Sequence, residues 1–418
     1  MPRSPPTPQV LNPSVVASAA PIGLDASRRN QTLHEVLEHV ALATSLREGP
    51  EGVARILRAV HQAERVQLKD LARQVRLPVP VLAAVRRELE HSGLLERKGG
   101  LHLSPKGQRF VEEEMGLATR HDPTCEACGG RGLRIDPIFQ QVVQALEDCL
   151  ATFPTVDVTL DQAFPTAESS VRRALYLYRT GALEGRRVIV LGDDDLMSIS
   201  AALLGRALGR ESLTRRLTVV ELDPRILEVL ERVNREENLG IELRPHDLRE
   251  PLPKDLRGHF DVFETDPPYT RAGAGLFVSR GVEALEPGLG RMGFLSLGPR
   301  DPDEQLAIQR DLGAMGLVIT DLVPAFNEYQ GASMFGGTSQ IFRLETTLES
   351  APAPAVDGEP IYTGESHPTQ RLYRCLSCGR EITVGQGQEQ ATVEALKAAG
   401  CPACQGTRFR FLKRLMKP

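Results

Sequence analysis

The chain alternates strand-like and helix-like patterns from Phe139 to Glu345, and this alternation constrains its fold more than any other feature. Strand and helix in strict alternation imply a parallel sheet that is covered on both faces. The helices are predicted at Leu196–Leu208, Pro224–Asn238, Gly275–Leu285 and Glu304–Met315. The strands are predicted at Arg187–Leu191, Leu217–Leu222, Ile241–Arg244, Asp261–Thr265, Met292–Leu297, Leu317–Val323 and Gln340–Leu344. We therefore predict an α/β, Rossmann-like catalytic domain over residues 139–345.

The last predicted strand, Gln340–Leu344, follows the strand before it through a loop that is too short for a helix. Because a parallel connection needs a longer crossover, we expect this strand to be antiparallel. We place it at the edge of a seven-stranded sheet of the methyltransferase type.

The N-terminal part divides into a tail and a helical module. Residues 1–30 contain several Pro, Ala and Ser without apolar periodicity, which is typical of a disordered tail. Residues 31–120 predict three helices, a small hairpin and a last helix, in an order that resembles a winged helix-turn-helix domain. Such a domain would bind DNA through its third helix, or would serve in dimerisation or packing. We favour packing, because glutamates directly follow the adjacent cations Arg86 and Arg87 on that helix.

Six of the seven cysteines lie in CxxC pairs, a spacing that favours metal binding over structural disulfides in a cytoplasmic chain. Cys125 and Cys128, in the segment 121–138, supply two of the four ligands that a structural zinc needs. His121 would add a third ligand, and a redox dithiol or two unligated thiols are the alternatives. Cys149 lies outside these pairs and is expected to pack as a small apolar residue.

A linker over residues 346–360 precedes a tail, residues 361–418, that contains the other two CxxC pairs. The loop between the pairs has about the length that zinc ribbons use. Four thiolates on one zinc would hold a small segment that has almost no hydrophobic core of its own. The sequence therefore predicts a structural zinc at Cys375, Cys378, Cys401 and Cys404.

The first predicted strand ends in Gly192-Asp193-Asp194-Asp195. Ligands of open α/β sheets bind at the carboxyl ends of the strands, so this turn belongs to the expected site. The Gly-x-Gly-x-x-Gly pattern of dinucleotide sites is missing. Three carboxylates would repel a phosphate and would attract a sulfonium or an ammonium group.

The next two strand ends also carry acidic residues. Glu221 or Asp223 would bind the two ribose hydroxyls of a donor, and Asp223 is equally a candidate cap of the helix that follows. Asp247, after the third strand, is expected to receive an adenine amino group, with a helix or turn cap as the alternative.

The fourth strand leads into Asp266-Pro267-Pro268-Tyr269-Thr270. The paired prolines remove two backbone donors and fix an extended turn, which leaves carbonyls directed into the cleft. Such a site accepts hydrogen bonds from a nucleophilic N–H while the aromatic ring packs on the substrate. The motif predicts an amine nucleophile, and an ordinary exit from a strand is the alternative.

These motifs together resemble the branched-chain polyamine synthases, a family of thermophile aminopropyltransferases. The similarity covers about residues 50–345, including Phe326-Asn327-Glu328-Tyr329, and it does not extend to the zinc-ribbon tail. It implies decarboxylated S-adenosylmethionine as donor and spermidine as acceptor, alkylated at its secondary amine. On this reading Gly192, Asp195, Glu221, Asp223, Asp247 and Pro267 bind the donor. The acceptor is bound by Pro268, Tyr269, Thr270, Glu328 and Tyr329.

The reaction needs a base, because the reacting nitrogen has a solution pKa near 10 and its deprotonation at pH 7 costs roughly 4 kcal/mol. We assign this role to Asp193 or Asp194. Asp266 and Tyr269 are expected to orient the nucleophile. The same carboxylates stabilise the ammonium form, so anchors for the terminal ammonium groups must be separate from the base.

Composition bounds the remaining possibilities. The net charge is -5, and outside Arg408–Lys417 there is no clear basic stripe, so nucleic acid is not an expected partner. No apolar run approaches the roughly 20 residues of a membrane span and no signal peptide is recognisable, so we expect a cytoplasmic protein and no membrane partner. We also expect a homodimer. The alternative function is an S-adenosylmethionine-dependent amino-methyltransferase acting on nucleic acid, because Asp266-Pro-Pro-Tyr269 occurs in both kinds of enzyme.

Overall fold

The computed structural model describes residues 35–117, 119–120, 124–157, 160–330, 337–353, 361–362, 370–385, 388–390 and 393–415. The predicted tail over residues 1–30, the linker residues 354–360 and the candidate ligand His121 lie outside these ranges. Among the described helices, none is both long and apolar enough to span a membrane.

The N-terminal module consists of short helices around one apolar core. This core gathers Ile56, Leu57, Leu71, Leu82 and Val85, all with no exposed surface. The wing strands β1 and β2 pair antiparallel. The assignment of the module as a winged helix stays a prediction. Its elements are α2 (Gly49–Ala63), α3 (Leu68–Val75), α4 (Val79–His91), β1 (Leu95–Glu96), β2 (His102–Leu103), α5 (Pro105–Arg109) and the π-turn η1 (Phe110–Glu114).

The central domain contains a seven-stranded sheet in the order β5-β4-β3-β6-β7-β9-β8. The first five of these strands run parallel, as the alternation of patterns predicts. Each of the seven predicted strands is present within a few residues of its expected bounds. The strands are β3 (Arg187–Leu191), β4 (Arg216–Glu221), β5 (Glu242–Pro245), β6 (Val262–Thr265), β7 (Met292–Leu297), β8 (Leu317–Glu328) and β9 (Thr338–Thr346).

The predicted edge position of the last strand is wrong. β9 is antiparallel to both neighbours, but it lies between β7 and β8, and β8 forms the edge. The physical reason is burial: Ile341, Phe342 and Leu344 on β9 have no exposed surface, whereas β8 alternates exposed and half-buried residues along most of its length. A strand that is apolar on both faces is more stable between two partners than at an edge.

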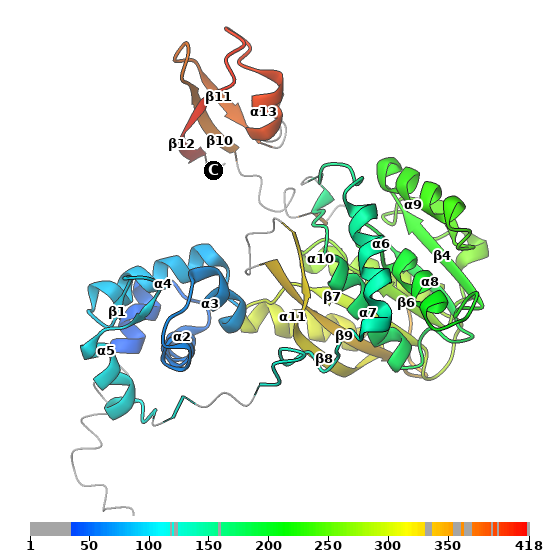
Figure 1. Ribbon diagram of the computed structural model, residues 1–418, viewed down its shortest axis with the longest axis horizontal. Coiled ribbons are helices and arrows are strands. Elements are labelled where there is room, and N and C mark those ends of the chain that lie inside the picture. The colour runs from blue at the N-terminus through cyan, green and yellow to red at the C-terminus, as the bar shows by residue number, and fades with distance from the viewer. Residues whose placement is uncertain are drawn as a thin grey trace, which may run out of the picture.

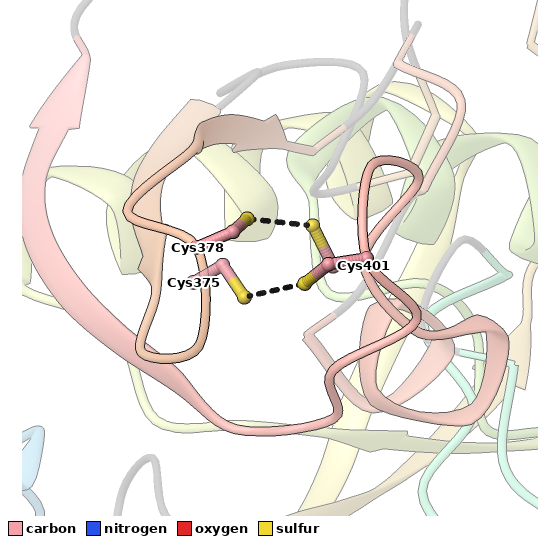
Figure 2. Close-up of side chains that lie close together, drawn as sticks. Cys375, Cys378 and Cys401 are labelled. Atoms are coloured by element: carbon pink, nitrogen blue, oxygen red, sulfur yellow. Dashed lines mark hydrogen bonds between the residues drawn. The ribbon is translucent and has the colours of Figure 1, made fainter.

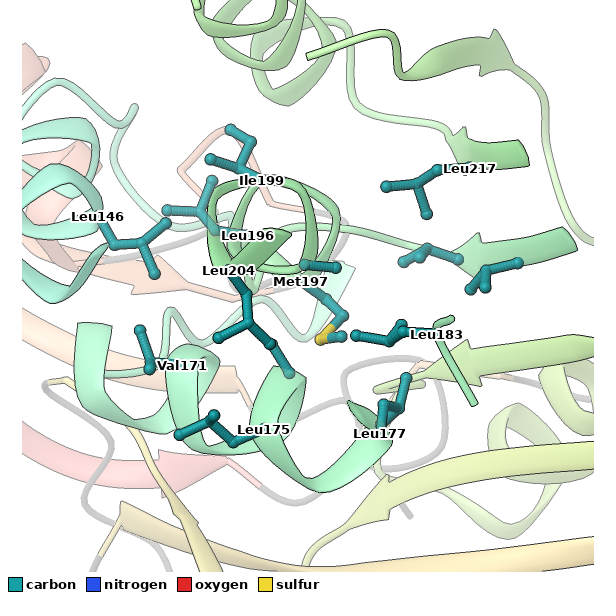
Figure 3. Packing of buried hydrophobic residues seen from close by; sticks show 14 of the residues in the cluster. Leu146, Val171, Leu175, Leu177, Leu183, Leu196, Met197, Ile199, Leu204 and Leu217 are labelled. Atoms are coloured by element: carbon teal, nitrogen blue, oxygen red, sulfur yellow. The ribbon is translucent and has the colours of Figure 1, made fainter. Parts of the chain in front are cut away.

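Helices cover both faces of the sheet (Figure 1). On one side, the apolar residues of α7 and α8 pack against each other and against the sheet, as Figure 3 shows for Val171, Leu175, Met197 and Leu204. Burial of each such side chain stabilises the fold by roughly 1.5–3 kcal/mol. This side has η2 (Pro137–Phe139), α6 (Gln140–Leu150), α7 (Ala167–Arg179), α8 (Met197–Ala207) and α9 (Pro224–Glu236). The other side has η4 (Lys254–Leu256), α10 (Arg271–Ala284) and α11 (Pro302–Ala314).

The C-terminal part forms a separate three-stranded antiparallel sheet in the order β11-β10-β12. Its small core consists of Tyr373, Val384 and Leu396, and Leu396 comes from a single short helix. The elements are β10 (Gln370–Cys375), β11 (Glu381–Val384), α13 (Val393–Ala399) and β12 (Phe409–Leu415).

Candidate active site and metal centre

The turn between β3 and α8 holds the three consecutive aspartates in different environments. Gly192 adopts φ +76°, a left-handed conformation that favours glycine, and its N–H donates to the carbonyl of Val220 over 2.8 Å. Asp193 is fully buried, and its carboxylate accepts hydrogen bonds from the N–H of Ser198 (3.1 Å) and from the Ser198 hydroxyl. Asp193 therefore fastens the start of α8 and does not line the pocket.

The other two aspartates of the turn divide between the interior and the pocket. Asp195 is buried, accepts a hydrogen bond from the N–H of Met197 (3.1 Å) and forms an ion pair with Arg173. Asp194 is only partly buried and lines the pocket. Among the three aspartates, Asp194 is the one whose side chain is available to a ligand.

Arg173, in the middle of α7, is the cation at the centre of the carboxylates. Its guanidinium has no exposed surface and contacts three acidic groups: Asp195, Glu264 (3.1 Å) and Asp266 (3.1 Å). Burial would lower its pKa, but Glu264 and Asp266 outweigh burial and raise that pKa, so the guanidinium stays charged. One oxygen of Glu264 and one of Asp266, Oδ1, are buried without a hydrogen-bond partner in the described structure.

A chain of hydroxyl groups fixes the other oxygen of Asp266. Tyr329 donates its hydroxyl hydrogen to Asp266 Oδ2, and Tyr269 donates to the Tyr329 oxygen over 3.0 Å. The Tyr329 hydroxyl also lies 2.8 Å from Ser339 Oγ, and the two tyrosine rings meet edge to face. Asp266 Oδ2 is therefore fully engaged, and Oδ1 is the oxygen left for a ligand.

One pocket connects these acidic groups with the ends of β4 and β5. Glu221 fixes the β4 end by accepting hydrogen bonds from the N–H groups of Asp193, Leu222 and Asp223 over 2.7–2.9 Å. Asp247 also lines the pocket and forms an ion pair with Arg249. The lining residues are Leu160, Asp161, Gln162, Gly192, Asp194, Val220, Glu221, Leu222, His246, Asp247, Leu248, Arg249, Asp266, Pro267, Pro268, Phe277, Ile361 and Tyr362.

Asp223 lies beside this pocket but performs a structural task. Its carboxylate accepts a hydrogen bond from the N–H of Arg225, as the cap of α9, and another from the side chain of Gln162 (2.8 Å). The bonds with Arg225 and Gln162 outweigh burial and lower its pKa to about 2. Of the two candidates for ribose binding, Glu221 faces the pocket and Asp223 caps the helix.

Burial raises the pKa values of the acidic groups that crowd this end of the sheet. The pKa of Asp193 rises to about 8, chiefly because burial outweighs its bonds with Ser198. Burial and the facing carboxylates of Asp266 and Glu221 raise the pKa of Asp194 well above its ordinary value. Burial also raises the pKa of Glu264 to about 7. The acidic groups at this end of the sheet are therefore easier to protonate than ordinary carboxyl groups, and of these three only Asp194 lines the pocket.

Two further predicted substrate residues, Thr270 and Glu328, lie outside the lining of the pocket. The Thr270 hydroxyl accepts a hydrogen bond from the N–H of Gly273 at the start of α10 and donates to the carbonyl of Ile361 over 2.6 Å. Glu328 forms an ion pair with Arg131. Pro267 and Pro268 line the pocket directly.

Sequence reasoning missed several residues of this site. Arg173 is one of them, and no local signal marks it, because the same helix also carries Arg172 and Arg179. Glu264 is another, and its position inside an apolar strand is a usable signal. No signal points to Gln162 or to Ile361 and Tyr362, because their place in the pocket depends on how distant loops return to the sheet.

The four C-terminal cysteines form the candidate metal centre. The sulfur atoms of Cys375 and Cys404 lie 3.6 Å apart, as do those of Cys378 and Cys401, and all four lie within 4.8 Å of one another (Figure 2). Sulfur atoms that surround a tetrahedral zinc at about 2.3 Å have very similar separations. The cluster therefore fits a zinc ion.

The other cysteines differ from this cluster. Cys149 lies on α6 and is buried within the core, so its prediction as a small apolar residue is confirmed. Cys128 is partly exposed and Cys125 is exposed, and within the described ranges they belong to no group of three or more metal-binding side chains. His121 lies outside the described residues, so its role as a third ligand stays a prediction.

Comparison with known proteins places this pocket in a recognised family. The model of the branched-chain polyamine synthase A C-terminal domain matches residues 141–351. An uncharacterized protein of Methanocaldococcus jannaschii is 38% identical over 380 residues, covering 91% of this chain and 93% of its own length. The N(4)-bis(aminopropyl)spermidine synthase of Thermococcus kodakarensis is 33% identical, covering 71% of this chain and 83% of its own. The enzyme of the same name from Thermus thermophilus is 34% identical, covering 72% and 83%.

A solved structure gives the same assignment. The branched-chain polyamine synthase of Thermus thermophilus, in complex with N4-aminopropylspermidine and 5'-methylthioadenosine, has 31% sequence identity with this chain. The match has a TM-score of 0.64 and covers 80% of this chain and 98% of that one.

Proposed function

This chain belongs to the branched-chain polyamine synthase family, and on that basis we propose that it transfers aminopropyl groups to a polyamine. The donor would be decarboxylated S-adenosylmethionine and the acceptor the secondary amine of spermidine. The observation that carries the proposal is that Asp194 and Asp266 line one pocket together with Glu221 and Asp247. The pocket would therefore have a cation-binding end next to a nucleoside-binding end.

The nucleoside end would bind the adenosine of the donor. Glu221 is buried, held by three backbone N–H groups and aimed into the pocket, which suits a carboxylate that accepts from ribose hydroxyls. Asp247 is suited to accept from the adenine amino group. Gly192 has no side chain, so the backbone of the turn would approach the donor closely. A Cβ added at Gly192 would lie 3.7 Å from Phe277, which is an ordinary van der Waals distance. Asp195 would not contact the donor itself, and it would contribute to donor binding only by holding Arg173 and the Gly192 turn in position.

The cationic end would bind the acceptor and remove its proton. We assign the base to Asp194, because Asp193 is engaged with Ser198 while Asp194 faces the pocket. Asp266 Oδ1 would accept from the nucleophilic N–H, and Tyr269 and Tyr329 would hold Asp266 in place. Pro267 and Pro268 would shape the contact. Thr270 and Glu328 would support the surrounding segments rather than touch the acceptor.

The transfer would be an in-line displacement. The lone pair of the secondary amine attacks the methylene carbon bonded to the sulfonium, and the C–S bond breaks with its electrons going to sulfur. The products are the alkylated amine and neutral 5'-methylthioadenosine, and the amine proton passes to Asp194. Alignment of the two substrates would supply most of the rate enhancement.

The direct test incubates the purified protein with decarboxylated S-adenosylmethionine and spermidine and measures product mass. We expect one or two aminopropyl additions together with 5'-methylthioadenosine. A parallel reaction with S-adenosylmethionine and nucleic acid tests methyl transfer, and methylated nucleic acid without any polyamine product would reject the proposal. Calorimetry should show weaker binding of S-adenosylmethionine, because the acidic pocket repels its carboxylate.

The finer features of the other parts are also proposals. We propose that Cys375, Cys378, Cys401 and Cys404 hold a structural zinc, supported by their sulfur separations. We propose that the N-terminal module is a winged helix used for packing in a homodimer. Sedimentation of the full chain and of a chain without residues 31–120 would test the second idea, because the truncated chain should lose the dimer.

A further inference from the structure

The C-terminal module differs in charge from the rest of the chain. From Gln370 to Pro418 the sequence has nine Lys or Arg and three Glu, a net charge of +6 in a chain whose total is -5. The other residues therefore carry -11. Even after the roughly two negative charges of a zinc tetrathiolate are counted, the module stays cationic. Charges segregated in this way attract a polyanion to one end of the molecule.

Three of the cations lie on the face of the three-stranded sheet that is turned away from α13, whereas Arg371 and Arg414 pair on the other face. Tyr373, Val384 and Phe409 belong to the face that packs on α13. The opposite face carries Arg374 and Arg410, which are directly paired across β10 and β12, and Lys413, which pairs with Leu372. The side chains of all three cations are exposed. Arg408, just before β12, is exposed as well.

The pairing of Arg374 with Arg410 is unfavourable for the sheet itself. Like charges directly opposite each other on adjacent strands destabilise the pair. Glu381 relieves only one of them, by an ion pair with Arg374 at 2.7 Å. Among the described side chains, Arg410 and Lys413 form no ion pair, so both cations are exposed and available to an external anion.

We propose that this face, which we call the ribbon face (Arg374, Arg410 and Lys413, with Arg408 beside it), binds the phosphate backbone of a nucleic acid. Arginine is well suited to this task, because its planar guanidinium can contact two phosphate oxygens at once. The exposed aromatic Phe411 pairs with Tyr373 and so belongs to the other face. The ribbon face thus offers phosphate contacts without a stacking platform, and it should bind duplex and single strands without sequence preference.

The test measures fluorescence anisotropy of a labelled DNA duplex and of a labelled single-stranded RNA with the full zinc-loaded chain. With three to four phosphates contacted, the logarithm of the duplex affinity should fall with the logarithm of salt with a slope of about -3. Arg410→Gln and Lys413→Gln should each reduce that slope by about one and leave aminopropyl transfer unchanged.

Lys397→Gln is the matched control. Lys397 is exposed on α13, so this substitution removes one positive charge from the module at a position away from the ribbon face. Its slope should equal that of the unchanged chain. The proposal is overturned if neither probe binds at low salt, or if Lys397→Gln weakens binding as much as Arg410→Gln. It is also overturned if polyglutamate competes as well as RNA, since the face would then fit an acidic protein. Each of these outcomes is independent of whether the central pocket transfers aminopropyl groups.

Discussion

The central domain and the C-terminal module each gather several acidic ligand groups in a small volume, but they balance the charge differently. In the central domain, Arg173 neutralises part of a carboxylate cluster, and Asp266 Oδ1 stays without a partner in the described structure. In the C-terminal module, four sulfur atoms face one another within 4.8 Å. The first cluster is open toward a pocket, and the second is closed.

The difference shows how a cluster of anions becomes either a site of turnover or a structural support. A closed tetrahedral thiolate site fits one permanent metal ion and leaves no position for a substrate. The carboxylate cluster has a fixed internal cation that is insufficient for all its charges, so a transient cationic ligand can complete it. Open and incomplete charge compensation is therefore the structural signature of the reactive end of this protein.

Loss of the metal should have the largest energetic effect, confined to the C-terminal module. Zinc binding contributes about 10–16 kcal/mol to the folding of small zinc domains, and this module has a core of only a few residues. Cys378→Ser should therefore lower the zinc content and unfold the module, while aminopropyl transfer by the central domain continues. Metal analysis and amide exchange of residues 370–415 would measure both effects.

Ser377→Ala is the control for this substitution, because it changes the same turn without removing a ligand. It should keep both the zinc and the amide protection. A zinc-free protein whose C-terminal strands remain protected would contradict the closed metal site.

Removal of the internal cation should be nearly as costly in the central domain. Arg173→Met leaves Asp195, Glu264 and Asp266 buried beside one another, and breaking a buried ion pair in this way typically costs about 3–5 kcal/mol. We expect a lower unfolding midpoint and little activity. Arg173→Lys should recover part of the stability but less of the activity, because a single ammonium cannot contact all three carboxylates in one plane.

Arg179→Met serves as the matched control on the same helix, because Arg179 is exposed and its guanidinium lies over the ring of Tyr176. Its unfolding midpoint should change little. Equal destabilisation by the two methionine substitutions would mean that Arg173 contributes through packing rather than through its charge.

The layout of the sheet was largely predictable from sequence, because buried parallel strands are short apolar runs separated by helical periods. Arg187–Leu191 and Met292–Leu297 were predicted to the residue. The position of β9 was not, because pattern and loop length give a strand's direction but not which neighbour it takes. The continuous burial of Ile341 and Phe342 decides that question, and only the packed structure reveals it.

The site was predictable to the level of the motif but not of the individual side chain. Sequence pointed to the Gly192 turn, but it could not separate Asp193 from Asp194, because the choice depends on the left-handed conformation of Leu196 and on the position of Ser198. Arg173 lies 22 residues before Asp195 in the chain and meets it only through the packing of α7 on α8. Contacts of this kind have no local sequence pattern.

Substitution of each aspartate in turn tests which carboxylate at the open cluster is the base. If Asp194 is the base, Asp194→Asn should lower the turnover number about 10² to 10⁴-fold while leaving the fold and donor binding largely intact. Asp193→Asn should have a smaller effect on turnover, because an amide can still bond with Ser198. Asp266→Asn should lose part of its activity through a higher KM for spermidine, because it would misplace the amine.

Steady-state kinetics across pH distinguishes these roles. Near-normal turnover of Asp194→Asn with spermidine would move the base to Asp266, the other aspartate at the cationic end of the pocket. If the turnover number of Asp266→Asn no longer rises as the pH increases, Asp266 itself is the base.

The smallest effect that we predict is a pH dependence of stability caused by the open cluster. Asp193 has a pKa of about 8 in the folded protein and Glu264 of about 7, both raised chiefly by burial, whereas unfolded carboxyl groups titrate near 4. Between these values the folded chain binds protons that the unfolded chain lacks, so the free energy of unfolding should fall as pH rises from about 4 to about 8. One such group contributes at most about 1.4 kcal/mol per pH unit. The lowered pKa values of Asp223 and Asp261, about 2 each, act only below pH 4 and do not oppose this trend between pH 6 and 8. Thermal unfolding at pH 6 and pH 8 should therefore show lower stability at pH 8, and Asp193→Asn should reduce the difference.

Spermidine should raise the unfolding midpoint more at pH 8 than at pH 6, because its ammonium groups stabilise the ionised carboxylates. Neutral 5'-methylthioadenosine should raise the midpoint about equally at both pH values. If spermidine stabilises the protein equally at both pH values, the ionisation of these carboxylates does not change between pH 6 and pH 8, and the raised pKa values are wrong.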